Sequence, residues 1–253
     1  MNKRLVFQYL LLTFSIVLFS WGLLVILGHF GLSVNSHFGL YVPYILGGLS
    51  PTIASYIVLK KNNEITSIKE WIKNLFRIKI SIKFYIFTIL LYSIIPIMFL
   101  LIPPGVERIE PLYMFFAFLP IMVIGGGLEE AGWRYILQPE LDKKFGFILS
   151  SIIVAPIWAL WHLPLFFIQG VRQYGTSFGI FTIGVIGLTF VLGAIRKITG
   201  SVFLCILFHS MVNAGYGIFI ITQTLYRNIF MAISLIIISI IAVFFMERRK
   251  VKL

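Results

Sequence analysis

The chain has one cysteine and only nine acidic residues among its 253 residues, and both low counts restrict the classes of protein to which it can belong. Because Cys205 has no second cysteine to pair with, an internal disulfide is excluded. The sequence contains no HExxH motif, no low-complexity tract, no repeat of fixed period and no long polar linker. These absences exclude a disulfide framework and the common zinc-protease signature, and they favour a single domain over residues 1–253.

Apolar residues dominate what is present. Hydrophobic residues make up 59% of the chain and the mean hydropathy is +0.99, whereas soluble domains are about 45–50% apolar. Several windows exceed the ~18 uncharged residues typical of a membrane-spanning helix. The first window is long and lacks a small-residue cleavage site, which favours a retained helix over a signal peptide. We therefore predict an all-α fold, a polytopic membrane helix bundle of about eight transmembrane helices, over residues 5–28, 38–59, 84–102, 111–138, 147–169, 178–195, 201–222 and 228–246.

The segment between the second and third predicted spans has a different pattern. Residues 64–83 read EITSIKEWIKNLFRIKISIK. The apolar residues fall at helical spacing with basic residues between them: Ile68, Trp71, Ile72 and Leu75, with Lys69, Lys73 and Arg77. This pattern is typical of an amphipathic helix that lies in the membrane interface.

The net charge of +12 is distributed as a membrane topology signal. If the N-terminus is cytoplasmic, most lysines and arginines fall on inner segments, including the C-terminal segment with Lys250 and Lys252. The outer loops then contain only Arg108, Arg172 and Arg227. This bias predicts cytoplasmic N- and C-termini and contact with anionic membrane lipid. It does not favour nucleic acid as a partner.

Two adjacent glutamates, Glu129 and Glu130, lie in the apolar run GGGLEEAGWRYIL. A carboxylate inside a bilayer costs a few kcal/mol, so function is the default hypothesis for it. Residues four apart share a helix face, so Glu130 and Arg134 are expected to form an ion pair. Glu129 points about 100° away and is free to act as a general base or acid. A packing ion pair would explain Glu130 and Arg134 but would leave Glu129 without a role. The preceding glycines, 125–127, permit close helix approach or a local break.

Two further polar pairs lie at the same spacing on later spans. Trp158 and His162 share a face in APIWALWHLPLFF, and His209 and Asn213 share a face in LFHSMVNAG. His209 and Asn213 can both donate hydrogen bonds towards one point, as a developing oxyanion requires. The competing interpretation of each pair is a polar contact between packed helices.

The depth of the three clusters favours a shared site. Glu129, His162 and His209 lie about 21, 27 and 18 Å from the nearest cytoplasmic charge along their spans, at 1.5 Å per residue. Tilt and proline bends accommodate these differences. One pocket built from three spans is therefore expected.

The three motifs as a set resemble those of the CPBP family. This family comprises CAAX prenyl proteases and bacterial relatives tied to bacteriocin processing and self-immunity. The EExxxR, aromatic-xxx-His and His-xxx-Asn motifs occur here in the family's order, over residues 110–220. The second motif departs from the family pattern, because Trp158 stands where Phe is usual.

The resemblance implies an intramembrane endopeptidase that depends on a glutamate. Glu129 would activate water and His162 would help to hold that water. Glu130 and Arg134 would orient the site, and His209 and Asn213 would form an oxyanion hole. The expected substrate is a membrane-embedded or lipidated peptide or protein, and the expected location is a bacterial cell membrane.

Three alternatives stay open from the sequence. Glu129, His162 and His209 are the residues that would bind zinc in a metal-dependent version of the same protease. The version without a metal or other cofactor is favoured, because each span supplies only one histidine. Intramembrane Glu and His residues also form proton relays in transporters, although no repeated halves are visible. A non-proteolytic immunity protein is the third alternative.

Overall fold

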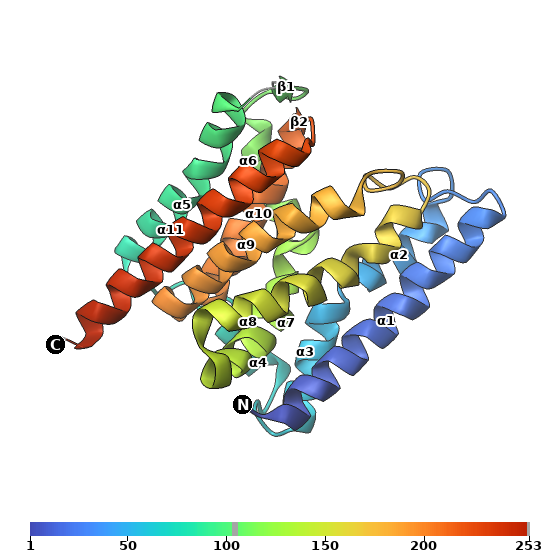
Figure 1. Ribbon diagram of the computed structural model, residues 1–253. Coiled ribbons are helices and arrows are strands. Elements are labelled where there is room, and N and C mark those ends of the chain that lie inside the picture. Colours follow the sequence, from blue (N-terminus) through green and yellow to red (C-terminus); the bar gives the residue numbers. More distant parts are fainter. Residues whose placement is uncertain (103–105, 252–253) are drawn as a thin grey trace.

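The computed structural model describes residues 1–102 and 106–251, in which the chain forms an all-helical bundle (Figure 1). The longer helices are α1 (Lys3–His29), α3 (Ser50–Lys61), α5 (Ile82–Leu101), α6 (Met114–Ile124), α8 (Gln138–His162), α9 (Phe178–Thr199), α10 (Val202–Ile218) and α11 (Leu225–Val251). The shorter helical elements are η1 (Phe38–Leu40), α2 (Tyr41–Gly48), α4 (Ile68–Leu75), η2 (Gly127–Glu129), α7 (Glu130–Gly132), η3 (Trp133–Leu137) and η4 (Leu163–Phe167). The predicted all-α membrane bundle is confirmed.

The predicted count of eight spans is not confirmed. Among the described residues, five helical stretches are long and apolar enough to cross a membrane, or six if the bent pair α2–α3 is one span. A single apolar stretch of helical elements, Met114–Phe167, contains most of two of the predicted spans. Gly146 interrupts it with φ +71°, a backbone conformation that favours glycine, and so turns the chain within α8. Helix α10, with 17 residues, is slightly shorter than a spanning helix.

A short amphipathic helix follows the second span, as predicted. Helix α4 begins after Ser67, whose hydroxyl accepts a hydrogen bond from the Glu70 backbone N–H. The backbone N–H and the hydroxyl of Thr66 both donate to Glu70 and hold the pKa of that carboxyl below its usual value. Trp71 and Leu75 are buried, whereas Ile68 and Ile72 stay exposed.

The outer surface of the bundle is apolar. Phe19 on α1, Leu100 on α5 and Phe116 on α6 are each more than 70% exposed. Large exposed apolar surfaces of this kind match a lipid environment and not water. Together with the apolar helices, they identify an integral membrane protein. Helix α1 begins and α11 ends at the same end of the bundle (Figure 1). Lys252, the last basic residue expected on the cytoplasmic side, lies outside the described residues.

Helices α8, α9 and α10 surround the polar residues. Helix α10 packs against α6 on one side and against α9 on another, and α9 packs against both α8 and α11. Two three-residue strands among the described residues, β1 (Val106–Arg108) and β2 (Phe219–Ile221), pair antiparallel. They join the segment after α5 to the end of α10.

Candidate active site

The two glutamates follow a break in the helical chain. Helix α6 ends at Ile124, and Gly126 has φ +154°, which favours glycine. A Cβ atom on Gly126 would lie 2.1 Å from Asn213 Nδ2 and 3.3 Å from His209 Nε2. A Cβ atom on Gly127 would lie 2.3 Å from Ser210 Oγ. The glycines therefore permit both the local break and the close approach to α10 that the sequence predicts.

Glu130 joins two of the predicted motifs. Its Oε2 lies 3.2 Å from Arg134 Nη1, and its Oε1 lies 2.8 Å from His209 Nδ1. Glu130 and Arg134 are both fully buried. The predicted i, i+4 ion pair is therefore present, and it also extends to α10. Arg134 Nη2 reaches the Thr189 carbonyl oxygen at 3.5 Å, which connects the pair to α9.

Glu129 faces a different set of groups, as the 100° offset predicts. The indole Nε1 of Trp158 donates a hydrogen bond to Glu129 Oε2 at 2.9 Å. The Nε2 atom of His162 lies 4.0 Å from the same oxygen. Glu129 is 8% exposed, so this carboxylate is almost completely enclosed by the bundle.

The hydrogen bond of His162 determines which ring nitrogen carries the proton. Nδ1 lies 2.9 Å from the carbonyl oxygen of Trp158. Because a carbonyl oxygen only accepts, Nδ1 is the donor and the neutral ring has its lone pair on Nε2. The lone pair of His162 and the carboxylate of Glu129 thus face each other.

His209 and Asn213 converge on the glycine break. His209 Nδ1 is bound to the Glu130 carboxylate, and Nε2 faces Gly126. The side-chain Nδ2 of Asn213 donates to the Gly125 carbonyl oxygen at 3.2 Å. Two nitrogen atoms of α10 therefore lie beside the segment that leads into Glu129, where each can donate to a substrate oxygen.

The structure thus groups all six residues singled out from the sequence: Glu129, Glu130, Arg134, His162, His209 and Asn213. The sequence interpretation missed two supporting contacts. It treats Trp158 only as an aromatic ring, although its N–H binds Glu129. It also assigns no contact to the first two spans, whereas the Thr52 hydroxyl of α3 donates to the Leu128 carbonyl oxygen at 2.7 Å.

The polar residues do not fit a zinc site. Within the part of the chain that the structure describes, no three His, Cys, Asp or Glu side chains are placed to hold a metal ion.

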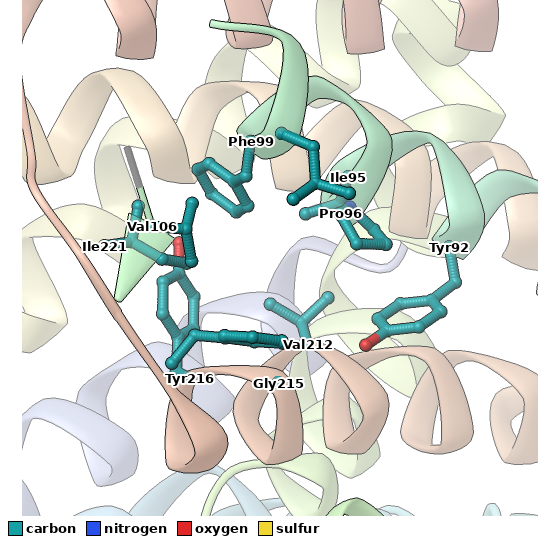
Figure 2. Close-up of a pocket in the computed structure, with 11 residues that line it drawn as sticks. Tyr92, Ile95, Pro96, Phe99, Val106, Val212, Gly215, Tyr216 and Ile221 are labelled. Carbon is teal, nitrogen blue, oxygen red and sulfur yellow. The ribbon is translucent and has the colours of Figure 1, made fainter. Parts of the chain in front are cut away.

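An apolar cavity of about 80 Å³ lies between α5 and α10. Figure 2 shows Tyr92, Ile95 and Phe99 of α5 facing Val212 and Gly215 of α10. Val212 precedes Asn213 in the chain, so the cavity and the polar groups lie on neighbouring faces of one helix.

The chain is similar to known proteins over the segment that contains these residues. The family model described as Type II CAAX prenyl endopeptidase Rce1-like matches residues 111–215. A curated relative, CAAX prenyl protease 2 of Methanococcus maripaludis, is 28% identical over 223 residues, which cover 75% of this chain and 77% of the relative. The matched segment contains all three motifs. Over these residues the chain is similar to the CPBP family, and it is an intramembrane endopeptidase of the CAAX protease-like type.

Proposed function

We propose that this endopeptidase hydrolyses its substrate with a water molecule activated by Glu129. The observation that carries the proposal is the pairing of a buried carboxylate with the lone pair of His162, 4.0 Å away. This separation is too long for a direct hydrogen bond and suits a bridging water. A water between them donates one hydrogen to each group and presents its own lone pair to a peptide carbonyl.

The second part of the mechanism is stabilisation of the oxyanion. In the doubly protonated ring, His209 donates Nδ1–H to Glu130 and Nε2–H towards Gly126, and the Glu130 carboxylate stabilises this cation. Asn213 Nδ2 is the second donor. Each preorganised donor of this kind contributes about 10²–10³-fold to the rate.

The reaction balances without a covalent enzyme intermediate. The water oxygen forms a bond to the peptide carbonyl carbon, and its proton moves to Glu129. The carbonyl oxygen becomes the oxyanion held by His209 and Asn213. The carbon–nitrogen bond then breaks, and Glu129 returns the proton to the leaving amine. Glu130 and Arg134 hold His209 in place and do not touch the substrate.

We further propose a lipidated, membrane-associated peptide as the substrate, with the names of the matched family and relative as support. The cavity of about 80 Å³ is much smaller than the roughly 300–1,000 Å³ pockets of drug-sized ligands. It suits one aliphatic side chain next to the cleaved bond. It is too small for a whole prenyl tail, which would lie along the apolar outer surface.

A cleavage assay on the full chain in lipid vesicles tests this function. The probe is a farnesylated peptide that ends in a CAAX sequence, and the same peptide without farnesyl is the control. We expect cleavage of the farnesylated peptide with one ¹⁸O from labelled water in the new carboxylate, and no loss of rate with a chelator. Absence of cleavage of both peptides by folded protein contradicts the proposed function. A lower cleavage rate in the presence of the chelator contradicts the metal-free mechanism but not the proposed peptidase function.

Substitution of Gly126 tests the oxyanion donors. In Gly126→Ala the new Cβ would meet Asn213 Nδ2 at 2.1 Å, so the donor must move. We expect kcat to fall about 100-fold, the effect of losing one donor. Gly175→Ala is the matched control, because Gly175 also has a positive φ, +72°, but nothing lies within 4 Å of its Cβ position. Equal losses in the two variants would show that backbone strain alone is responsible.

Filling the cavity tests the proposed side-chain subsite. Gly215 lines the cavity, and a Cβ there would lie 3.1 Å from the Tyr92 hydroxyl. In Gly215→Leu we expect kcat/KM to fall at least about 10-fold for a peptide with leucine next to the cleaved bond, and far less for one with alanine. Gly22→Leu on α1, where the added group meets open space, is the control. Equal losses for both peptides would place the substrate side chain elsewhere.

A further inference from the structure

Trp158 contacts the proposed catalytic residues with both its side chain and its main chain. Its indole N–H donates to Glu129, and its carbonyl oxygen accepts from His162 Nδ1. The ring of Trp158 meets the His209 ring edge-on at 5.5 Å, and the Arg134 guanidinium lies 4.8 Å from the centre of the Trp158 ring. Trp158 itself is 2% exposed.

We propose that Trp158 is a positioning residue that fixes the orientation of the Glu129 carboxylate through its indole N–H. The proposal rests on the function proposed above, in which Glu129 is the base. The N–H occupies one lone pair of Oε2, so the carboxylate cannot rotate freely about its last bond. The remaining lone pairs are held towards the gap in front of His162.

This hydrogen bond satisfies two groups that have few alternatives in a bilayer. A buried indole N–H needs an acceptor, and a buried carboxylate needs donors. Glu129 is the acceptor of the Trp158 indole N–H. The contacts of the ring with Arg134 and His209 do not need this N–H, because any aromatic ring of that shape could make them. The polar atom of the indole is therefore used specifically at the carboxylate.

The main chain of the same residue makes the arrangement more rigid. Trp158 and His162 are one turn apart in α8, and the carbonyl oxygen of Trp158 orients the His162 ring. One residue thus holds both groups that face the bridging water. Catalytic groups need to be held within about 0.5 Å of the productive geometry, which flexible glutamate torsions alone do not provide.

Kinetics of two substitutions at position 158 test the proposal. Trp158→Phe keeps an aromatic ring over Arg134 but removes the donor. The unnatural residue 3-benzothienylalanine keeps the two-ring shape and replaces N–H with sulfur. For both we expect kcat on the farnesylated peptide to fall about 10- to 100-fold, as for a lost hydrogen bond to a charged group, with KM within about twofold.

Trp71→Phe is the matched control for these variants. Trp71 is also buried and also donates its indole N–H, to the Ser55 hydroxyl at 3.2 Å, but it has no described contact with the proposed catalytic residues. We expect its kcat to stay within about twofold of the unsubstituted chain. If benzothienylalanine at position 158 retains full kcat, the shape of the ring and not its N–H matters, and the proposal fails.

A spectroscopic measurement tests the same contact without any substrate. With ¹⁵N-labelled indole in nanodiscs, the five tryptophans give separate N–H signals, and the one lost in Trp158→Phe is assigned. We expect Glu129→Gln to move this signal by more than any other, because the charged acceptor becomes neutral. An unmoved signal would show that the hydrogen bond is absent and would overturn the proposal, whether or not the peptide is cleaved.

Discussion

Glu129→Gln is expected to reduce kcat by about 10²–10⁴-fold while the protein stays folded. Glutamine has almost the same shape, and its amide oxygen can still accept the hydrogen bond of Trp158. It cannot take a proton from water, so the general-base contribution is lost. The measurement is single-turnover cleavage of the farnesylated peptide in vesicles, with thermal unfolding measured on the same preparation.

Glu140→Gln is the control for this loss. Glu140 is also 8% exposed, but its Oε2 accepts from the Asn2 backbone N–H at 2.7 Å, and its other oxygen is paired with Lys143. Glu140 has no described contact with the proposed catalytic residues, so the kcat of the Glu140→Gln variant should be unchanged. If Glu129→Gln retained more than about a tenth of the activity, Glu129 would not be the base. We expect the Glu129→Gln variant to bind the peptide normally but not to cleave it.

Arg134→Met is expected to lower the free energy of unfolding by about 3–5 kcal/mol. Removal of one partner from a buried ion pair leaves an uncompensated charge, here the fully buried carboxylate of Glu130. The Arg134 side chain also packs over the Trp158 ring, and methionine restores this packing only in part. The measurement is denaturant unfolding in detergent, followed by tryptophan fluorescence, together with the cleavage rate.

The double variant Glu130→Gln with Arg134→Met separates stability from activity. It removes both charges, so much of the lost stability should return. The glutamine oxygen can still accept from His209 Nδ1, but it no longer stabilises a cation on that ring. Cleavage should therefore stay low in the double variant. Recovery of both stability and activity would show that the ion pair serves packing alone.

Much of the fold is predictable because a bilayer imposes a simple length rule. Long apolar runs predict helices, and the bounds expected for the first span, 5–28, differ by only a residue or two from those of α1. The number of membrane spans is harder to predict from the sequence. The predicted spans 111–138 and 147–169 fall in one helical stretch, Met114–Phe167, whose turn depends on the conformation of Gly146, and the α2–α3 segment bends by 49°. Neither feature is encoded in hydropathy.

The site is predictable as a set of residues but not as a set of contacts. Spacing of four predicts the Glu130–Arg134 pair, because both residues lie on one helix. The contact of Glu130 with His209 spans 79 positions in the chain, and that of Thr52 with Leu128 spans 76. Such partners depend on how helices pack, and a single sequence does not specify this. One signal at Trp158 was available, since a buried indole N–H needs an acceptor.

The helical segment that contains the glutamates changes its winding twice within eleven residues. Element η2 is a 3₁₀ turn, α7 is one α-helical turn, and η3 is a π-turn. A 3₁₀ turn winds the chain more tightly than an α-helix and a π-turn winds it less tightly, so the two departures oppose each other. Downstream of Leu137 the chain continues directly into α8. Both departures from α-helical winding are therefore confined to the short segment between the glycine break and α8, which carries the two carboxylates.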